Sequence, residues 1–168
     1  MRRLQPGSFS QEYSVRLLDE TDIPAISLLC SGNTQFYEYC GQPFSEETIR
    51  SDLRITPPGK EAEDKYYAGF YDGECLCAII DLIDGYPDNQ TAFIGFFMME
   101  KTLQGAGCGT AIIAQLCQYL TSMGFLRVQL GIDRDNPQSM HFWKKNGFVP
   151  VREIAQENGV IVLAQKML

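Results

Sequence analysis

The chain has 168 residues, and 45% of them are apolar, which is typical of one globular domain with a hydrophobic core. Its 14 basic and 21 acidic residues give a net charge of −7, which disfavours nucleic acid as a partner and mildly favours cationic small molecules. No apolar run approaches the roughly 20 residues that span a bilayer, and no signal-peptide stretch is present, so we expect a cytoplasmic protein without a membrane partner. Six cysteines without a Cys-x-x-Cys motif or a histidine cluster are expected to be reduced thiols and to bind no metal.

The N-terminal part is predicted to contain a tail, a strand and a helix. Residues 1–12 are polar and rich in turn formers, so we expect a flexible tail there and a single domain over residues 13–168. Alternation of apolar and polar residues over 13–18 predicts the first strand. A helix over 23–30 is expected to follow, because a polar capping segment precedes this apolar run.

A segment without a clear period separates this helix from the next one. Residues 31–44 are rich in aromatic residues and are expected to be irregular. Ser45 is a typical N-cap and predicts a second helix. The Pro57-Pro58-Gly59 run is expected to end that helix, because proline and glycine interrupt helical structure.

The middle of the chain is predicted to form three strands. Residues 65–71 and 74–83 flank Asp72-Gly73, a dipeptide that is typical of tight hairpin turns. The apolar run over 92–99 predicts a further strand. No internal repeat or low-complexity segment interrupts the pattern, which agrees with a single domain.

A glycine-rich turn between this strand and a helical run over 111–123 carries the clearest functional signal. The turn reads Gln104-Gly105-Ala106-Gly107-Cys108-Gly109-Thr110. Glycine lets a backbone approach a ligand closely, and a helix N-terminus offers unpaired N–H groups to a phosphate. A Walker loop is excluded because no lysine follows the last glycine, and the glycine spacing differs from that of a dinucleotide fold. A tight, closely packed turn would give the same pattern, so this motif alone does not decide between the two interpretations.

A second motif follows a predicted strand over 126–132. Asn136 opens a predicted helix, Ser139 lies three positions later, and Phe142-Trp143 forms an aromatic pair. Gly147-Phe148 then leads out of the helix. The closing strands are predicted over residues 148–154 and 160–165.

Together the two motifs resemble those of the GNAT superfamily of N-acetyltransferases. Gln104 to Gly109 is similar to the superfamily's Arg/Gln-x-x-Gly-x-Gly/Ala turn, and the run from Asn136 to Phe148 is similar to its closing motif. The resemblance covers about residues 13–168. It implies an α/β fold in which helices flank a mixed, mostly antiparallel, splayed sheet. It also implies acetyl-CoA as the cosubstrate.

The resemblance further implies where acetyl-CoA binds. Backbone groups of Phe97 and Met99 would pair with the pantetheine arm, where a bulge splays their strand from the strand over 126–132. Amides from Gly105 to Thr110 would hold the pyrophosphate. The expected coenzyme-binding residues are Phe97, Met99, Gln104, Gly105, Ala106, Gly107, Cys108, Gly109, Thr110, Asn136, Ser139 and Trp143.

The proton donor that is common in the superfamily is missing from this chain. Members commonly carry a tyrosine seven residues after the motif's asparagine, and Trp143 stands at that position. An indole N–H donates a hydrogen bond but does not deliver its proton near neutral pH. We therefore expect the ring of Trp143 to be partly exposed and to orient or solvate the sulfur of coenzyme A. The alternative is that it packs the helix against the sheet. Tyr86 or water is then left as the acid.

The general base is equally open. The strand over 92–99 contains no carboxylate, so the strand glutamate of some relatives is absent. Asp81, within an apolar strand, and Glu100, just past the bulged strand, are the nearest candidates, although both could equally face solvent. We select Asp81 as the base, acting through water. The only histidine, His141, is expected to be exposed.

The resemblance places the aromatic segment over the acceptor site. Phe36, Tyr37 and Tyr39 are therefore candidates for its wall, with packing under a loop as the alternative. The expected reaction is direct attack of a primary amine on acetyl-CoA. Because acidic residues lie nearby, we expect the amine to be a cationic small molecule. The alternative is a non-catalytic acyl-CoA-binding or regulatory module, favoured by Trp143 and by the missing strand glutamate. The acceptor itself does not follow from the sequence, and a homodimer stays open.

Overall fold

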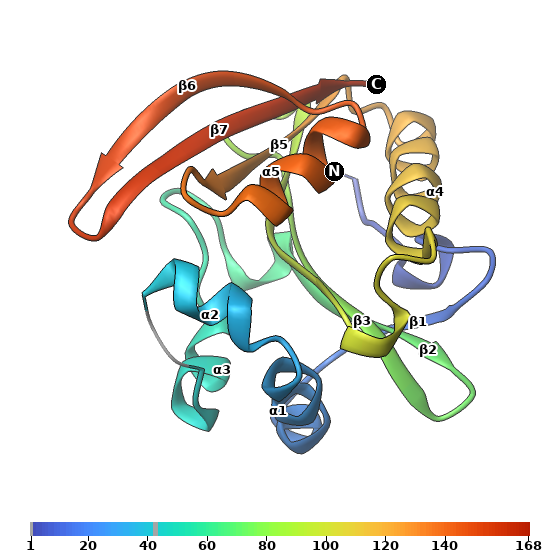
Figure 1. Ribbon diagram of the computed structural model, residues 1–168. Helices are drawn as coiled ribbons and strands as arrows, with labels where there is room; N and C mark the ends of the chain where they lie inside the picture. The colour runs from blue at the N-terminus through green and yellow to red at the C-terminus, as the bar shows by residue number, and fades with distance from the viewer. Residues whose placement is uncertain (1, 42–43) are drawn as a thin grey trace.

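The computed structural model describes residues 2–41 and 44–168, which form a twisted open sheet with helices on both faces (Figure 1). The strands are β1 (Ser14–Leu17), β2 (Lys65–Asp72), β3 (Cys75–Asp84), β4 (Thr91–Met99), β5 (Arg127–Asp133), β6 (Val149–Gln156) and β7 (Gly159–Met167). The helices are α1 (Ile23–Ser31), α2 (Thr34–Cys40), α3 (Glu46–Asp52), α4 (Cys108–Ser122) and α5 (Pro137–Lys145).

Within the described residues, the strands make one seven-stranded sheet in the order β1-β2-β3-β4-β5-β7-β6. Only β4 and β5 run parallel, and every other neighbouring pair is antiparallel. The expected α/β fold with a mixed, mostly antiparallel sheet is confirmed. None of the helices in the described chain has the length and apolar character needed to cross a bilayer.

Most predicted elements are present because their local signals are strong. Gly73 and Glu74 connect β2 to β3, as the Asp72-Gly73 dipeptide predicts. Ser45 caps α3, where its Oγ accepts a hydrogen bond from the Thr48 N–H at 3.1 Å. Asn136 caps α5 in the same way.

Two sequence expectations are wrong, and the first concerns the segment that contains α2. Residues 31–44 were expected to be irregular, yet 34–40 are helical. The helix has no apolar period of its own, but Phe36 and Tyr37 pack against the apolar cluster beside α1. Tertiary contacts therefore stabilise a helix that local propensity does not favour. Residues 42 and 43 lie outside the described residues.

The second wrong expectation concerns the N-terminal tail. The segment 2–12 packs on the domain, and both Leu4 and Phe9 are fully buried against β2 and α4. The Leu4 N–H also donates a hydrogen bond to the Tyr66 hydroxyl at 3.1 Å, and the Gln5 N–H donates one to the Tyr119 hydroxyl at 2.8 Å. Two apolar residues in a polar segment are enough to anchor it to the core.

The sheet separates two apolar clusters. One contains α4, the α5 ring of Trp143 and the N-terminal segment, and the other contains α1 and α3. This arrangement covers both faces of the central strands.

β4 separates from β5 at its centre, as the resemblance predicts. The parallel pairing of these strands runs only from Thr91 to Ile94 on β4. At that point Gly95 forms a bulge, because Ile94 pairs with Leu82 whereas Phe96 pairs with Asp81. The second half of β4 therefore leaves a gap beside β5.

Candidate functional site

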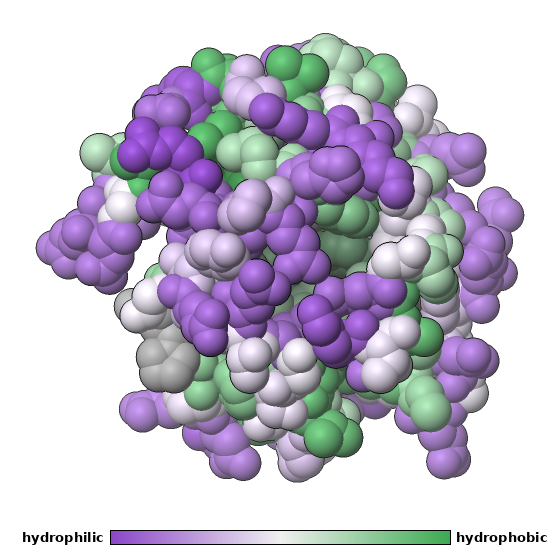
Figure 2. Space-filling view, in the orientation of Figure 1, coloured by the Kyte–Doolittle hydropathy of each residue, from purple (hydrophilic) through white to green (hydrophobic). Residues whose placement is uncertain are grey.

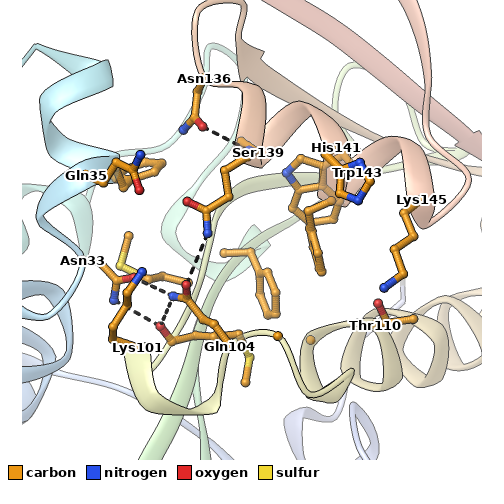
Figure 3. Close-up of a pocket in the computed structure, with 18 of the residues that line it drawn as sticks. Asn33, Gln35, Lys101, Gln104, Thr110, Asn136, Ser139, His141, Trp143 and Lys145 are labelled. Carbon is orange, nitrogen blue, oxygen red and sulfur yellow. Dashed lines mark hydrogen bonds between the residues drawn. The ribbon is translucent and has the colours of Figure 1, made fainter.

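A cavity of about 510 Å³ occupies the gap between β4 and α5. Figure 2 shows a hollow near the centre of this face, with an apolar floor and a hydrophilic rim. Its wall is built by the end of β4, the glycine turn, the first turn of α4, one face of α5 and the connection between α1 and α2 (Figure 3). All the expected coenzyme-binding residues line the cavity except Ala106 and Cys108. Those that line it are Phe97, Met99, Gln104, Gly105, Gly107, Gly109, Thr110, Asn136, Ser139 and Trp143.

The glycines of the turn have two different roles. Gly105 and Gly107 have φ values of +83° and +84°, and a Cβ on either would meet no protein atom within 4 Å. They are needed for the left-handed backbone, and the space beside them is open. A Cβ on Gly109 would instead lie 3.2 Å from the Phe142 ring, so this glycine lets α4 approach α5 closely.

The first turn of α4 offers unpaired backbone donors at the cavity. Gly107 is the N-cap, and no side chain caps the helix. The first intrahelical bond runs from the Ala111 N–H to the Gly107 carbonyl at 3.0 Å. The N–H groups before Ala111 and the positive end of a 15-residue helix are thus available to an anion.

The charge around the cavity is opposite to that of the whole chain. Although the chain has a net charge of −7, no aspartate or glutamate among residues 2–41 and 44–168 lines this cavity. Lys101 and Lys145 do line it, and neither forms an ion pair within the described part of the chain. Figure 3 shows Lys145 extending from α5 in the direction of Thr110. The cavity therefore favours an anionic ligand.

The backbone of β4 turns hydrogen-bonding groups into the gap. The Glu100 N–H donates a hydrogen bond to the Cys77 carbonyl of β3 at 2.8 Å, so Glu100 and Cys77 are a hydrogen-bonded pair of the antiparallel ladder. Because bonded and non-bonded pairs alternate in an antiparallel ladder, Met99 and Phe97 point their N–H and C=O groups away from β3. The Met99 carbonyl already accepts two hydrogen bonds from side chains, as described below. The Phe97 groups and the Met99 N–H face the gap.

Trp143 lies in the floor of the cavity and is only 7% exposed, so the expectation of a partly exposed ring is wrong. Its ring contacts those of Phe97, Phe142 and Phe148 at centroid distances of 5.9, 4.9 and 5.1 Å. These edge-on contacts fix the orientation of the indole. Among the described residues, the indole N–H has no hydrogen-bond partner. Both roles expected for Trp143, packing and presenting a donor, are therefore compatible with its position.

The remaining motif residues act mainly through the helix that they begin. Asn136 is buried, and its Oδ1 accepts a hydrogen bond from the Ser139 N–H at 3.0 Å. This cap fixes the start of α5 at the cavity edge. His141 is exposed, as expected, and lies at the rim. Cys108 does not line the cavity, and the pKa of the neighbouring Tyr13 is raised to about 12, mainly by burial.

Asp81 lies on the α1 and α3 side of the sheet and does not line the cavity. Its Oδ2 accepts from the Lys65 Nζ at 2.7 Å, whereas its buried Oδ1 has no partner among the described residues. Burial raises the pKa of Asp81, while Lys65 opposes the shift. Oδ2 also lies 2.8 Å from the place that a Cβ on Gly95 would take. The carboxylate thus sits over the bulge where β4 begins to leave β5.

The alternative acid and base also lie outside the cavity wall. Glu100 accepts a hydrogen bond from the Thr102 N–H at 2.9 Å and so caps a short 3-10 turn. The Tyr86 ring packs against Phe93 in the loop before β4. Of the aromatic residues expected at the acceptor site, Phe36 lines the cavity, whereas Tyr37 and Tyr39 do not.

Sequence reasoning missed several residues of the wall. Gln138 and Lys145 share one face of α5 with His141 and Phe142, so the helical period could have identified them. Asn33 and Lys101 carry no comparable local signal. Asn33 reaches the wall only through contacts with residues that are distant in the sequence.

Comparison with known proteins identifies the family. The model of the acetyltransferase (GNAT) family matches residues 32–148, which include both motifs and the central strands. The chain belongs to the GNAT acetyltransferase family. In this GNAT chain the glycine turn, the splay and the cavity occupy one continuous region. A search of curated proteins gives no match.

Solved structures share the GNAT fold at low sequence identity. An acetyltransferase from Thermus thermophilus superimposes with a TM-score of 0.74 at 17% identity, over 92% of this chain and 96% of that chain. The PaiA N-acetyltransferase from Thermoplasma acidophilum, in complex with coenzyme A, gives 0.65 at 16% identity, over 92% and 98%. A chimeric spermidine N-acetyltransferase SpeG from Vibrio cholerae gives 0.68 at 16% identity, over 94% and 96%.

Proposed function

We propose that this GNAT acetyltransferase transfers the acetyl group of acetyl-CoA directly to a primary amine. The observation that carries the proposal is the cavity beside β4, where a helix N-terminus and two unpaired lysines meet and no carboxylate is found among the described lining residues. Such a site suits a phosphate-bearing ligand. The exposed backbone of β4 beside it suits an amide-containing arm.

Acetyl-CoA has both features, and it supplies an activated thioester carbonyl. The backbone from Gly107 to Thr110 would hold the pyrophosphate, with Lys145 as an additional cation. The Phe97 backbone and the Met99 N–H would pair with the pantetheine amides. Gly105 would leave room beside the turn, because a side chain there would project into open space. The donor set therefore fits the cosubstrate that the family uses.

Trp143 is assigned to orienting the sulfur. Its buried ring is held by three neighbouring rings, and its N–H is a free donor. Because an indole does not deliver its proton near neutral pH, the thiolate that leaves the carbonyl carbon is protonated by water.

Asp81 is proposed as the general base on the opposite side of the β4 bulge. Its free Oδ1 can accept a proton from the attacking amine through a water molecule. Burial raises the pKa of Asp81, which makes the carboxylate a better proton acceptor than an exposed aspartate. Lys65 keeps the group oriented by holding Oδ2.

A cationic small molecule is the acceptor that we favour. Asp81 and Asp52 lie close enough on the α1 and α3 side for the charge of one to raise the pKa of the other. The net charge of −7 would also attract a cation. Cys30, Cys75, Cys77, Cys108 and Cys117 are free thiols, which is compatible with a reducing compartment, and we propose a cytoplasmic location.

A non-catalytic acyl-CoA-binding module is the second candidate. It is favoured by the absence of tyrosine and carboxylate side chains from the described lining of the cavity. Such a module would bind acetyl-CoA and would not turn it over.

One assay separates these candidates. The protein is incubated with acetyl-CoA and a panel of cationic, neutral and anionic amines, and free thiol release and acetylated product are measured. Our proposal predicts turnover that is fastest with cationic amines and that slows as salt screens the attraction. Binding of acetyl-CoA without turnover of any amine would support the non-catalytic module. Faster turnover of neutral or anionic amines, at rates insensitive to salt, would contradict the cationic acceptor.

A further inference from the structure

A buried asparagine links the α1 and α2 connection to the coenzyme turn. Asn33 is 7% exposed and stands between the two helices. Its Nδ2 donates hydrogen bonds to the carbonyls of Leu29 and Met99, each at 3.1 Å. Its Oδ1 accepts one from the Gln104 Nε2 at 2.6 Å. Figure 3 shows the contact between Asn33 and Gln104 at one edge of the cavity.

The Asn33 side chain does not cap the helix that it precedes. Asn33 occupies the N-cap position of α2, yet its side chain makes no capping hydrogen bond. All its side-chain hydrogen bonds instead go to α1, to the end of β4 and to the first residue of the glycine-rich motif. An asparagine that only began a helix would be expected to accept from an N–H of the first turn.

Gln104 contacts both Asn33 and the Met99 carbonyl. Its Nε2 also donates to the Met99 carbonyl at 3.1 Å, so this carbonyl accepts from two side chains. Both lone pairs of the carbonyl are then in use. On the other side, the Gln138 Nε2 approaches the Gln104 Oε1 at 3.4 Å and extends the set to α5.

We propose that Asn33 is a positioning residue of the coenzyme site. It holds Gln104 and the Met99 carbonyl together, which fixes the start of the glycine turn relative to the end of β4. The pantetheine arm consequently pairs with the Phe97 backbone and the Met99 N–H, and not with the Met99 carbonyl. Asn33 also joins the coenzyme turn to the segment that carries Phe36 at the cavity wall. The inference rests on the proposed function for the identity of the ligand.

The test is the affinity for coenzyme A, measured by calorimetry on folded protein. Asn33→Ala should raise Kd about tenfold, because it breaks buried hydrogen bonds at the cavity wall. Gln104→Ala should raise it similarly, and the double variant should lose less than the product of the two effects, because the residues act together. Asn146→Ala is the matched control. Asn146 is also 7% exposed and donates to the Phe142 carbonyl at 2.8 Å, but it does not line the cavity.

Two further variants keep the test decisive if Asn33→Ala does not fold. Asn33→Asp keeps the acceptor for Gln104 and loses the donors to Met99 and Leu29, and should also raise Kd. Gln104→Glu, at a less buried position, removes both Nε2 hydrogen bonds and should do the same.

The possible outcomes separate this inference from the proposed function. An increase in Kd in the Asn33 and Gln104 variants, with an unchanged Kd in Asn146→Ala, supports the inference. An unchanged Kd in Gln104→Glu and in the folded Asn33 variants, or additive effects in the double variant, overturns it while the coenzyme site stands. Absence of coenzyme A binding by the wild-type protein overturns the proposed function and the inference together.

Discussion

The two sides of β4 differ in how they treat charge. On the cavity side, backbone N–H groups and the unpaired Lys101 and Lys145 create a positive field that no carboxylate among the described lining residues neutralises. On the α1 and α3 side, Lys65 and Asp81 already neutralise each other at 2.7 Å, and both are largely buried. The first side therefore favours an anionic ligand, whereas the second holds one carboxylate in place.

The largest expected effect tests the cavity side at the glycine turn. Gly107→Val should abolish measurable coenzyme A binding by calorimetry, because the side chain would project into the open space beside the backbone donors. Gly124→Val is the matched control. Gly124 lies just past the other end of α4, has a φ of +88°, and likewise has no atom within 4 Å of a Cβ.

Both valine variants should lose a similar amount of stability, about 1–2 kcal/mol, because each forces a branched residue into a left-handed backbone. Thermal unfolding of the two variants measures this. An unchanged affinity for coenzyme A in folded Gly107→Val would show that coenzyme A does not bind at this turn.

The next effect tests the other side of β4. Asp81→Asn should lower kcat by about 10²-fold and leave the affinity for coenzyme A unchanged, because loss of a general base affects only the chemical step. The ordinary pKa of an aspartate is about 3.9. Because burial raises the pKa of Asp81, wild-type activity should begin to fall at a higher pH than this when the solution is acidified. The variant should lack this acidic limb.

Asp84→Asn is the control for that experiment. Asp84 is at the end of the same strand, its pKa is also raised by burial, and it forms an ion pair with Arg2 at 3.5 Å. An equal loss of kcat in both variants would assign the effect to buried charge in general and not to a base at position 81.

A smaller effect is expected from the cation on α5. Lys145→Ala should weaken coenzyme A binding about fivefold at low salt, because one exposed charge-assisted contact contributes about 1 kcal/mol. Lys144→Ala changes the net charge equally but removes a residue that does not line the cavity. Titrations at two salt concentrations should show a reduced salt dependence for the first variant alone, and equal behaviour of the two would contradict a local role.

The smallest effect is expected at Trp143. Trp143→Phe should keep most of the activity, because it removes one N–H and some ring area, whereas loss of acid catalysis costs about 10²-fold or more. Trp143→Tyr should gain rate, since a phenol near the sulfur can donate its proton. Unfolding must be monitored in parallel, because the ring is buried. A 10²-fold loss in a folded Phe variant that binds acetyl-CoA normally would show that the indole donor takes part in catalysis.

The two sides also differ in how far the sequence predicts them. The glycine turn and the cap of Asn136 depend on short-range signals, so their place in the fold could be predicted, whereas the splay was expected only from the resemblance to the family. The ion pair of Lys65 with Asp81 and the contact of Asn33 with Gln104, 71 residues apart, depend on how distant segments meet.

The same limit explains the errors at the N-terminus and in α2. Leu4 is buried only because β2 presents Tyr66 and its neighbours to it. Phe36 belongs to a helix because Phe96 packs against it. Neither contact can be predicted from the local pattern of the sequence.

The most direct test of the coenzyme site is a crystal structure of the protein with coenzyme A. We expect the pyrophosphate oxygens to accept hydrogen bonds of about 2.7–3.2 Å from the backbone N–H groups between Gly107 and Thr110. We also expect the pantetheine arm to lie between β4 and β5, paired with the Phe97 backbone and the Met99 N–H. Coenzyme A bound at another surface, or a pyrophosphate without contact to this turn, would show that the glycine turn is not the coenzyme site.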